Sequence, residues 1–379
     1  MNNYHKLLRS LLVTLGLATP ALFSCAEDID LYAGFSASSV PNVLLVLDNS
    51  ANWGSSLSVS NCYFKDNGVV TTNGPKSSSP DKEQGAKMAI EKCALYNLID
   101  ALPVKPIGGS VTANNNALFN VGLMLFNNSG GNSGGYPRKA FTALTSNNKA
   151  AFKNIISGLT IGGDKGSGAA FAKAMHEAYL YYRGSAPYSG TMESKWDSAA
   201  VSGGNYVSPA TSTCGPNHVI FIANGGPGEV TDSEARALLS AAGGDATQIN
   251  YPTSVVKGSD QANWADEFAR FMRGVDVSSK DDVQGIITHG VAVTGASSDG
   301  LYPNFIRSMA NHGGGSYFSA SDADTLEAKL TEIFNQMQGV DSVFTSASIP
   351  VSTNARGTFM NQVFMGTFRP DVGANPRWR

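Results

Sequence analysis

Short, unbroken apolar segments along this chain are separated by longer segments in which apolar residues recur every three or four positions. Residues 43–47 (VLLVL) and 219–223 (VIFIA) are short apolar segments rich in branched side chains, and polar residues follow each of them directly. This pattern is typical of strands buried on both faces of a parallel sheet. Further strands are predicted at 119–126, 286–293 and 317–318.

Helices are predicted between these strands. The clearest one opens at residues 79–81 (SPD), where an N-cap residue precedes a proline, and it ends before Pro103. Its apolar side chains, which include Met88, Leu95 and Leu98, fall on one face. Other helices are predicted at 149–159, 169–182, 232–242, 263–272, 303–311 and 325–337. Strands that alternate with helices predict an α/β fold with a doubly wound, mainly parallel sheet and helices on both faces.

The pattern changes near Val340. Residues 343–345 and 362–366 alternate like the strands of a β-hairpin, and no helical segment follows them. Many of the 41 glycines stand in polar runs, which predicts long surface loops. We therefore expect one domain over 27–340 with long Gly/Ser-rich loops, and a β-rich segment over 341–379.

The first 26 residues are typical of a secretory signal. Lys6 and Arg9 precede an apolar run at 11–17, and small residues lead to a predicted cleavage site after Ala26. An alternative is a lipoprotein signal that ends at Cys25, although its motif would contain the bulky Phe23. No other segment is apolar over the roughly 20 residues that a membrane span needs. The chain is therefore expected to be exported, to the periplasm or outer membrane and the cell surface.

Three cysteines would remain after removal of the signal: Cys62, Cys93 and Cys214. An oxidising compartment favours a disulfide between two of them. Cys62 to Cys93 is the favoured pair, because it would tie the loop after the first strand to the following helix. Cys214 would then be free or paired with a partner. Three buried thiols are the alternative, since a free cysteine behaves as a small apolar residue.

Charge and catalytic motifs exclude several function classes. The net charge is −3, from 27 basic and 30 acidic residues, and no basic tract is present, so nucleic acid is not an expected partner. Residues 131–135 (GNSGG) match the pattern around a nucleophilic serine at Ser133, but Tyr136-Pro137 follows where that motif needs a helix. The histidines show no ligand spacing. We therefore expect a non-catalytic protein.

Polar side chains follow the two strongest strands. In an open α/β sheet, ligands bind beyond the carboxyl ends of the strands. Asp48, Ser50 and Asn52 follow the first of these strands, Asn224 follows the other, and Ser167 lies in a glycine loop that enters a helix. Carboxylate, hydroxyl and amide oxygens are hard ligands that suit Mg²⁺ or Ca²⁺. The sequence therefore predicts a cation site made of these five residues.

The arrangement strand-Asp-x-Ser-x-Asn, small-residue loop before a helix, and strand-Asn-Gly resembles the three loops of a von Willebrand factor A domain and its metal-ion-dependent adhesion site. More narrowly, the chain resembles the N-terminal half of PilY-type tip adhesins of type IV pili. Four segments carry that resemblance: 171–182 (FAKAMHEAYLYY), 264–273 (WADEFARFMR), 313–318 (GGGSYF) and 345–370 (TSASIPVSTNARGTFMNQVFMGTFRP). In that family a β-propeller follows the A domain, so 341–379 is expected to begin a C-terminal domain that this chain lacks.

The resemblance implies a role in type IV pilus biogenesis and tip-associated adhesion. Its implied partners are minor pilins at the pilus tip and a host or abiotic surface. The chain departs from the family's adhesion motif, because Asn52 replaces a serine, Ala169 stands at the position of a threonine, and Asn224 replaces an aspartate. Since divalent affinity follows the number of charged ligands, two alternatives stay open. Either the site binds metal, or it is a degenerate, metal-free crevice in a structural assembly factor.

Overall fold

A computed structural model describes residues 40–57, 61–127, 134–166, 168–212, 215–228, 232–295 and 300–340, together with two short strands at 344–346 and 366–368. Its centre is a six-stranded sheet with the strand order β10-β9-β8-β1-β4-β5. All neighbouring strands of this sheet run parallel except the edge pair of β4 and β5. The strands are β1 (Asn42–Leu47), β4 (Asn120–Phe126), β5 (Gly135–Ala143), β8 (Asn217–Ala223), β9 (Ile286–Val293) and β10 (Gly314–Ala320).

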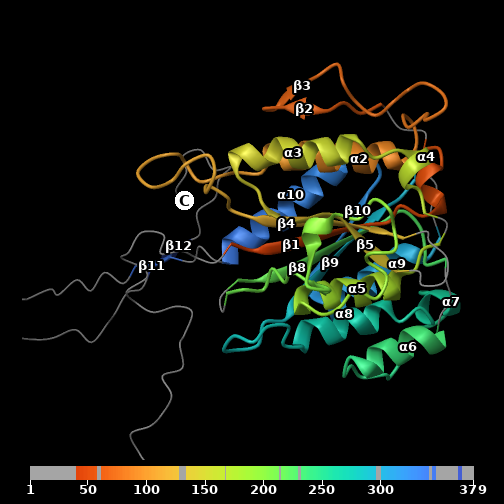
Figure 1. The fold of residues 1–379 in the computed structure, drawn as a ribbon. Helices are drawn as coiled ribbons and strands as arrows, with labels where there is room; N and C mark the ends of the chain where they lie inside the picture. The colour runs from red at the N-terminus through yellow and green to blue at the C-terminus, as the bar shows by residue number, and fades with distance from the viewer. Residues whose placement is uncertain are drawn as a thin grey trace, which may run out of the picture. The chain divides into compact units, whose positions relative to one another are not determined.

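Helices cover both faces of the sheet (Figure 1). One face carries α2 (Lys87–Ala101), α3 (Ser146–Ser157) and α10 (Ala323–Val340). The other carries α5 (Phe171–Arg183), α8 (Ala265–Gly274) and α9 (Tyr302–His312). The order of the strands and this two-sided cover confirm the predicted doubly wound, mainly parallel α/β fold.

Short helices and small hairpins lie in the connections between these elements. The short helices are α4 (Ile161–Asp164), α6 (Asp232–Ala241), α7 (Gly258–Gln261), η1 (Ala51–Gly54) and η2 (Ser198–Ala200). Two small hairpins pair β2 (Lys65–Asp66) with β3 (Val69–Val70) and β6 (Val201–Ser202) with β7 (Asn205–Tyr206). The predicted hairpin after the main domain is also formed, by β11 (Phe344–Ser346) and β12 (Gly366–Phe368), although the second strand lies later than expected.

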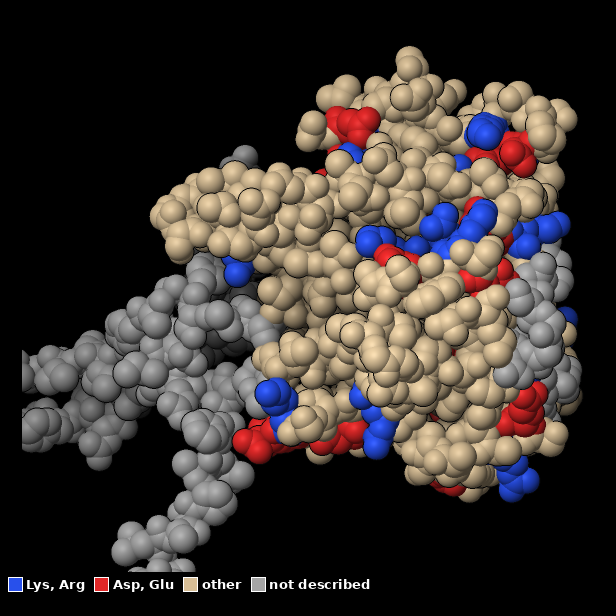
Figure 2. Space-filling model, in the orientation of Figure 1, with Lys and Arg blue, Asp and Glu red and all other residues tan. Residues whose placement is uncertain are grey.

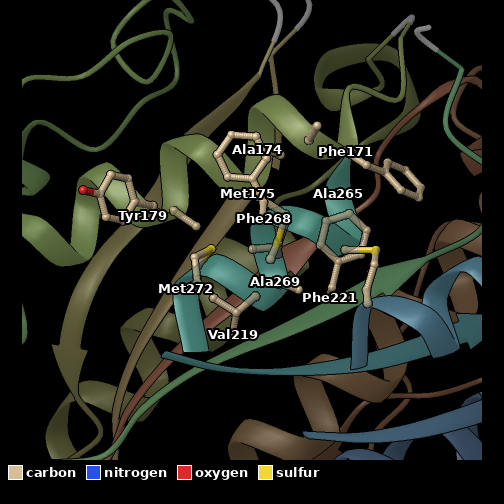
Figure 3. Packing of buried hydrophobic residues seen from close by; sticks show 14 of the residues in the cluster. Phe171, Ala174, Met175, Tyr179, Val219, Phe221, Ala265, Phe268, Ala269 and Met272 are labelled. Atoms are coloured by element: carbon tan, nitrogen blue, oxygen red, sulfur yellow. The ribbon is translucent and has the colours of Figure 1, made fainter. Parts of the chain in front are cut away.

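The sheet separates two apolar clusters. Along β8, Val219 and Phe221 face α5 and α8, whereas Ile220 and Ile222 face the cluster that includes α2 and α10. Figure 3 shows the first cluster, in which Phe268 and other side chains of α5 and α8 pack on Val219 and Phe221. Alternate side chains of one strand therefore enter different cores, which explains why the central strands read as unbroken apolar runs.

One expectation about secondary structure is wrong, and one strand of the sheet was not predicted. The helix predicted from 79–81 begins at Lys87, because 76–86 forms a turn in which the amides of Glu83 and Gln84 donate to the carbonyl of Lys76. The strand that was not predicted is β5, which contains a proline, and a proline inside a sequence segment argues against a central strand. Pro137 is tolerated because β5 is the edge strand of the sheet.

The favoured cysteine pair is brought together but is not bonded. Cys62 and Cys93 are free thiols: Cys62 Sγ donates to the carbonyl of Ala89 at 3.1 Å, and Cys93 Sγ donates to the carbonyl of Tyr63 at 3.2 Å. The neighbouring Cys62 thiol and burial raise the pKa of Cys93. Cys25, Cys214 and the predicted signal lie outside the described residues. Among the helices that the structure does describe, none combines the length and apolar character of a membrane span.

Candidate functional site

Three loops meet at the carboxyl ends of β1, β4 and β8, and we call their described residues 48–52, 164–166, 168–170 and 224–228 the three-loop site. Asn49 links the first two loops: its Nδ2 donates to the carbonyls of Phe126, at 3.2 Å, and Asp164, at 2.5 Å. The amide of Phe126 donates to Asn49 Oδ1 at 2.8 Å, and Gly166 N donates to Asn49 O at 2.7 Å. Asn49 thus uses both its side chain and its carbonyl to hold the loops in place.

Asp48 joins the first loop to the third. Its Oδ1 accepts from Ser50 N at 3.0 Å, and its Oδ2 accepts from Asn224 N at 3.2 Å. In return, the side-chain amide of Asn224 donates to the carbonyl of Asp48. Asp48, Ser50 and Asn224 are all buried. The structure therefore brings together three of the five predicted ligands, as the anchor between two loops.

Burial raises the pKa of Asp48 to about 6. Hydrogen bonds from Ser50 and Asn224 and the positive charge of Lys87 act in the opposite direction and stabilise the ionised form. Desolvation is the largest effect because the carboxyl group is removed from water. Asp48 thus lies in a setting where its negative charge is only partly balanced.

Two charged residues of α2 complete the site, one helical turn apart. Lys87 Nζ donates to the carbonyl of Asn224 at 2.5 Å and lies 5.8 Å from the centre of the Tyr302 ring. Glu91 Oε2 accepts from Trp53 Nε1 at 2.6 Å. The pKa of Glu91 is raised well above its ordinary value, first by burial and then by the negative charge of Asp48. Two carboxyl groups and one ammonium group therefore share a buried region under the loops.

Lys87 and Glu91 were not among the predicted site residues. Their spacing could have indicated them, because oppositely charged residues four positions apart lie on the same side of a helix. The helix, however, was expected to begin at 79–81 and to bury one apolar face, which left its charged residues for solvent. In the structure α2 is buried nearly all round, and Lys87 is its first residue.

The other two predicted ligands are Asn52 and Ser167, and Ser167 lies outside the described residues. Asn52 is exposed, and its amide lies against Gly225, in the space that a Cβ atom would take. Ala169 contacts the third loop through its backbone, since its carbonyl accepts from Gly228 N at 3.2 Å. Asn52 and Ala169 therefore both lie beside the third loop.

The described donors do not fit a divalent cation. One feature favours a cation, because Asn224 Oδ1 is buried and has no hydrogen-bond partner among the described residues. Against it, both carboxylate oxygens of Asp48 already accept backbone hydrogen bonds, and the Lys87 ammonium lies in the same region. No group of three or more His, Cys, Asp or Glu residues in the described part of the chain could hold a metal ion.

Solved structures that match the chain at low identity include two pilus proteins. BatB from Bacteroides thetaiotaomicron is 12% identical, with a TM-score of 0.39, over 79% of this chain and 98% of that one. A point mutant of the PilB minor pilin from Streptococcus sanguinis is 14% identical, with a TM-score of 0.43, over 80% and 62%. The pilus adhesin SpaC from Lactobacillus rhamnosus GG is 11% identical, with a TM-score of 0.40, over 80% and 31%. These similarities do not assign a function to the chain.

No family model matches the sequence. No curated protein matches it either.

Proposed function

We propose that this chain is an exported, non-catalytic binding protein that acts in type IV pilus biogenesis and in adhesion at the pilus tip. The observation that carries the proposal is the three-loop site itself. Its loops are fixed to one another by buried hydrogen bonds of Asp48 and Asn49, at the carboxyl ends of the strands, where α/β proteins bind ligands. Loops that are already fixed are suited to hold a partner, because little conformational entropy is lost on binding.

The chemistry of the site supports binding over catalysis. The polar atoms of Asp48 and Asn49 are directed at backbone groups of neighbouring loops. The described residues of the three loops contain no histidine or cysteine, which are common catalytic bases and nucleophiles. The groups open to a partner are Asn52, Lys165 and Gly228, which are exposed around the buried anchor.

Surface charge supports a protein or an uncharged surface as the partner. Figure 2 shows a face on which lysine and arginine are interspersed with aspartate and glutamate and most of the surface is uncharged. Such a surface lacks the continuous positive field that steers proteins to polyanions. Minor pilins at the pilus tip are the partners that we propose, with a host or abiotic surface as the contact.

The competing function is that of a structural assembly factor in which the three-loop site binds nothing. A double variant, Asn52→Ala with Lys165→Ala, separates the two because it removes exposed side chains and leaves Asp48 and Asn49 intact. The control variant, Asn250→Ala with Lys280→Ala, removes an exposed residue of each same type elsewhere on the domain. Cells that carry each variant in place of the native protein are compared for surface pilin and for attachment.

Under our proposal, attachment falls at least about tenfold in the site variant, the loss of roughly 1.4 kcal/mol of binding energy, and stays at the native level in the control. The amount of pilin on the surface of cells with the site variant then shows whether the same contact also supports pilus assembly. Native attachment and native surface pilin in the site variant would reject the three-loop site as a binding surface and leave the structural role.

A further inference from the structure

Lys87 occupies a position that is unfavourable for a cation. It is the first residue of α2, where the helix dipole places partial positive charge, and Ala86 before it offers no side-chain cap. The residue is only 5% exposed, so its ammonium group also loses most of its hydration. A lysine is retained at such a position when surrounding groups stabilise its charge.

The three-loop site supplies those groups. The ammonium donates to the carbonyl of Asn224 at 2.5 Å, and it interacts with the carboxyl groups of both Asp48 and Glu91. Tyr302 presents its ring to the ammonium at 5.8 Å. A carbonyl dipole and an aromatic face therefore contact this positive charge at the end of the sheet, and the carboxyl groups of Asp48 and Glu91 lie within its electrostatic reach.

Asn224 is matched to this arrangement. Its side-chain amide donates to the carbonyl of Asp48. An aspartate at this position would turn a carboxylate oxygen toward that carbonyl, and the contact could not form without an extra proton. The asparagine that departs from the adhesion motif is thus the residue type that the local hydrogen bonds require.

We propose that the Lys87 ammonium is the built-in cation of the three-loop site and that the site is complete without a divalent metal. The amine reaches the third loop from α2 and offsets part of the negative charge of Asp48, which would otherwise attract an ion. A divalent cation at the same place would meet the ammonium at close range, and the Coulomb repulsion would exclude it. This inference concerns the chemistry of the site and does not depend on the pilus role proposed above.

The test is to remove the lysine and add the missing carboxylate. Lys87→Gln with Asn224→Asp should bind Mg²⁺, Ca²⁺ or Mn²⁺ at least about tenfold tighter than the native protein, since affinity follows the number of charged ligands. Calorimetric titration of the purified chain measures this directly. Terbium is a second probe, because Trp53 beside Glu91 can sensitise its luminescence when the ion is bound in the site.

The matched control uses the other buried lysine of the same helix. Lys92 Nζ lies 2.8 Å from Glu83 Oε2 and 2.6 Å from the carbonyl of Leu159, and neither partner belongs to the three-loop site. Lys92→Gln with Asn224→Asp therefore changes the same charges without opening the site. The proposal is overturned if this control gains the same affinity, if the native protein already binds as tightly, or if the folded Lys87 variant gains nothing.

A second measurement covers the case in which the Lys87 variant does not fold. Proton–nitrogen NMR of lysine ammonium groups in the native protein should show a slowly exchanging signal for Lys87, because buried and hydrogen-bonded ammonium protons are protected from water. Lys87→Arg, which keeps the charge, identifies that signal by its loss. Millimolar Mg²⁺ should leave the signal unmoved, whereas a shift or loss on addition of Mg²⁺ would show that the ion competes for the site and would refute the inference.

Discussion

His218 and His289 form a buried pair on the neighbouring strands β8 and β9. His218 Nδ1 and His289 Nε2 are 3.2 Å apart, and Ser316 N donates to His289 Nδ1 at 3.1 Å. Because Nδ1 of His289 accepts, its Nε2 carries the proton and donates to His218. Burial lowers the pKa of His218 to about 3, with a smaller contribution from His289, and lowers the pKa of His289 to about 4. Both rings are therefore neutral in the folded protein.

This pair should make the protein less stable in mild acid. Below the ordinary histidine pKa of about 6.5, the unfolded chain takes up protons that the folded chain does not, so stability falls with pH down to about 4 and 3. Between pH 7 and pH 5 the free energy of unfolding should fall by about 2 kcal/mol for each ring. Urea unfolding at pH 7 and pH 5 measures it for the native protein and for His218→Gln with His289→Gln.

The difference in the free energy of unfolding between pH 7 and pH 5 is compared across the variants, and this comparison gives the contribution of the histidine pair. Buried acids such as Glu267, whose pKa burial raises to about 9, act in the opposite direction, because the folded state keeps a proton that the unfolded state releases. An identical pH response in the double variant would mean that the pair does not titrate as its burial requires.

At the residue scale, the sequence predicted which loops carry the polar side chains of the candidate site, but not which charged residues are buried beneath those loops. Asp48 and Asn224 were found because a polar residue that ends a buried strand has a known place in an α/β sheet. Lys87 and Glu91 were missed because their burial depends on loops that pack over α2 from distant parts of the chain. The His218–His289 contact was missed for the same reason, since strand pairing across 71 residues is not visible in local spacing.

At the scale of elements, side-chain contacts attach the loop that holds Cys62 to α2 and to the turn before it. Gln84 Nε2 donates to the carbonyl of Cys62 at 2.8 Å, and Asn97 Oδ1 accepts from Lys65 N at 2.8 Å. Oxidation of the Cys62 and Cys93 thiols would transfer two electrons and two protons to an oxidant such as oxidised glutathione. The disulfide would close a loop of about 31 residues and should add about 3–4 kcal/mol to the free energy of unfolding.

The measurement compares oxidised and reduced protein in a Cys214→Ser background, which removes Cys214 from the exchange. Peptide mass spectrometry identifies the bond, and denaturant unfolding gives the stability change. Cys62→Ser in the same background should show no response to the redox conditions. If Cys62 and Cys93 stay reduced in excess oxidised glutathione, the pairing predicted from the sequence is rejected.

Element type was more predictable than element boundaries. The strands and the helices on both faces follow from local periodicity, because each buries a continuous surface of its own. The start of α2 could not be predicted, since it is set by contacts of the preceding turn, where Lys92 Nζ contacts Glu83 at 2.8 Å. Strand β5 also lacked a local signal, because it is held by pairing with β4 and tolerates Pro137 through its edge position.

At the scale of the whole molecule, the central strands of the sheet contribute side chains to two cores. Phe221 and Ile222 are neighbours on β8, yet Phe221 packs with α5 and α8 while Ile222 packs with the cluster under α2 and α10. The two helical layers pack on opposite faces of the same strands, so the loss of those strands would expose both cores. The described domain should therefore unfold in one cooperative step, despite the size of its two apolar clusters.

Core truncations on the two faces test this cooperativity. Phe221→Ala and Ile222→Ala should each cost about 2–5 kcal/mol, because both side chains are fully buried. Each variant should shift a single calorimetric transition as a whole, whichever face is damaged. Val69→Ala on the exposed β2–β3 hairpin should change stability by less than about 0.5 kcal/mol. If Phe221→Ala and Ile222→Ala instead lower different transitions of one protein, the two faces are separate folding units, and the sheet does not transmit stability between them.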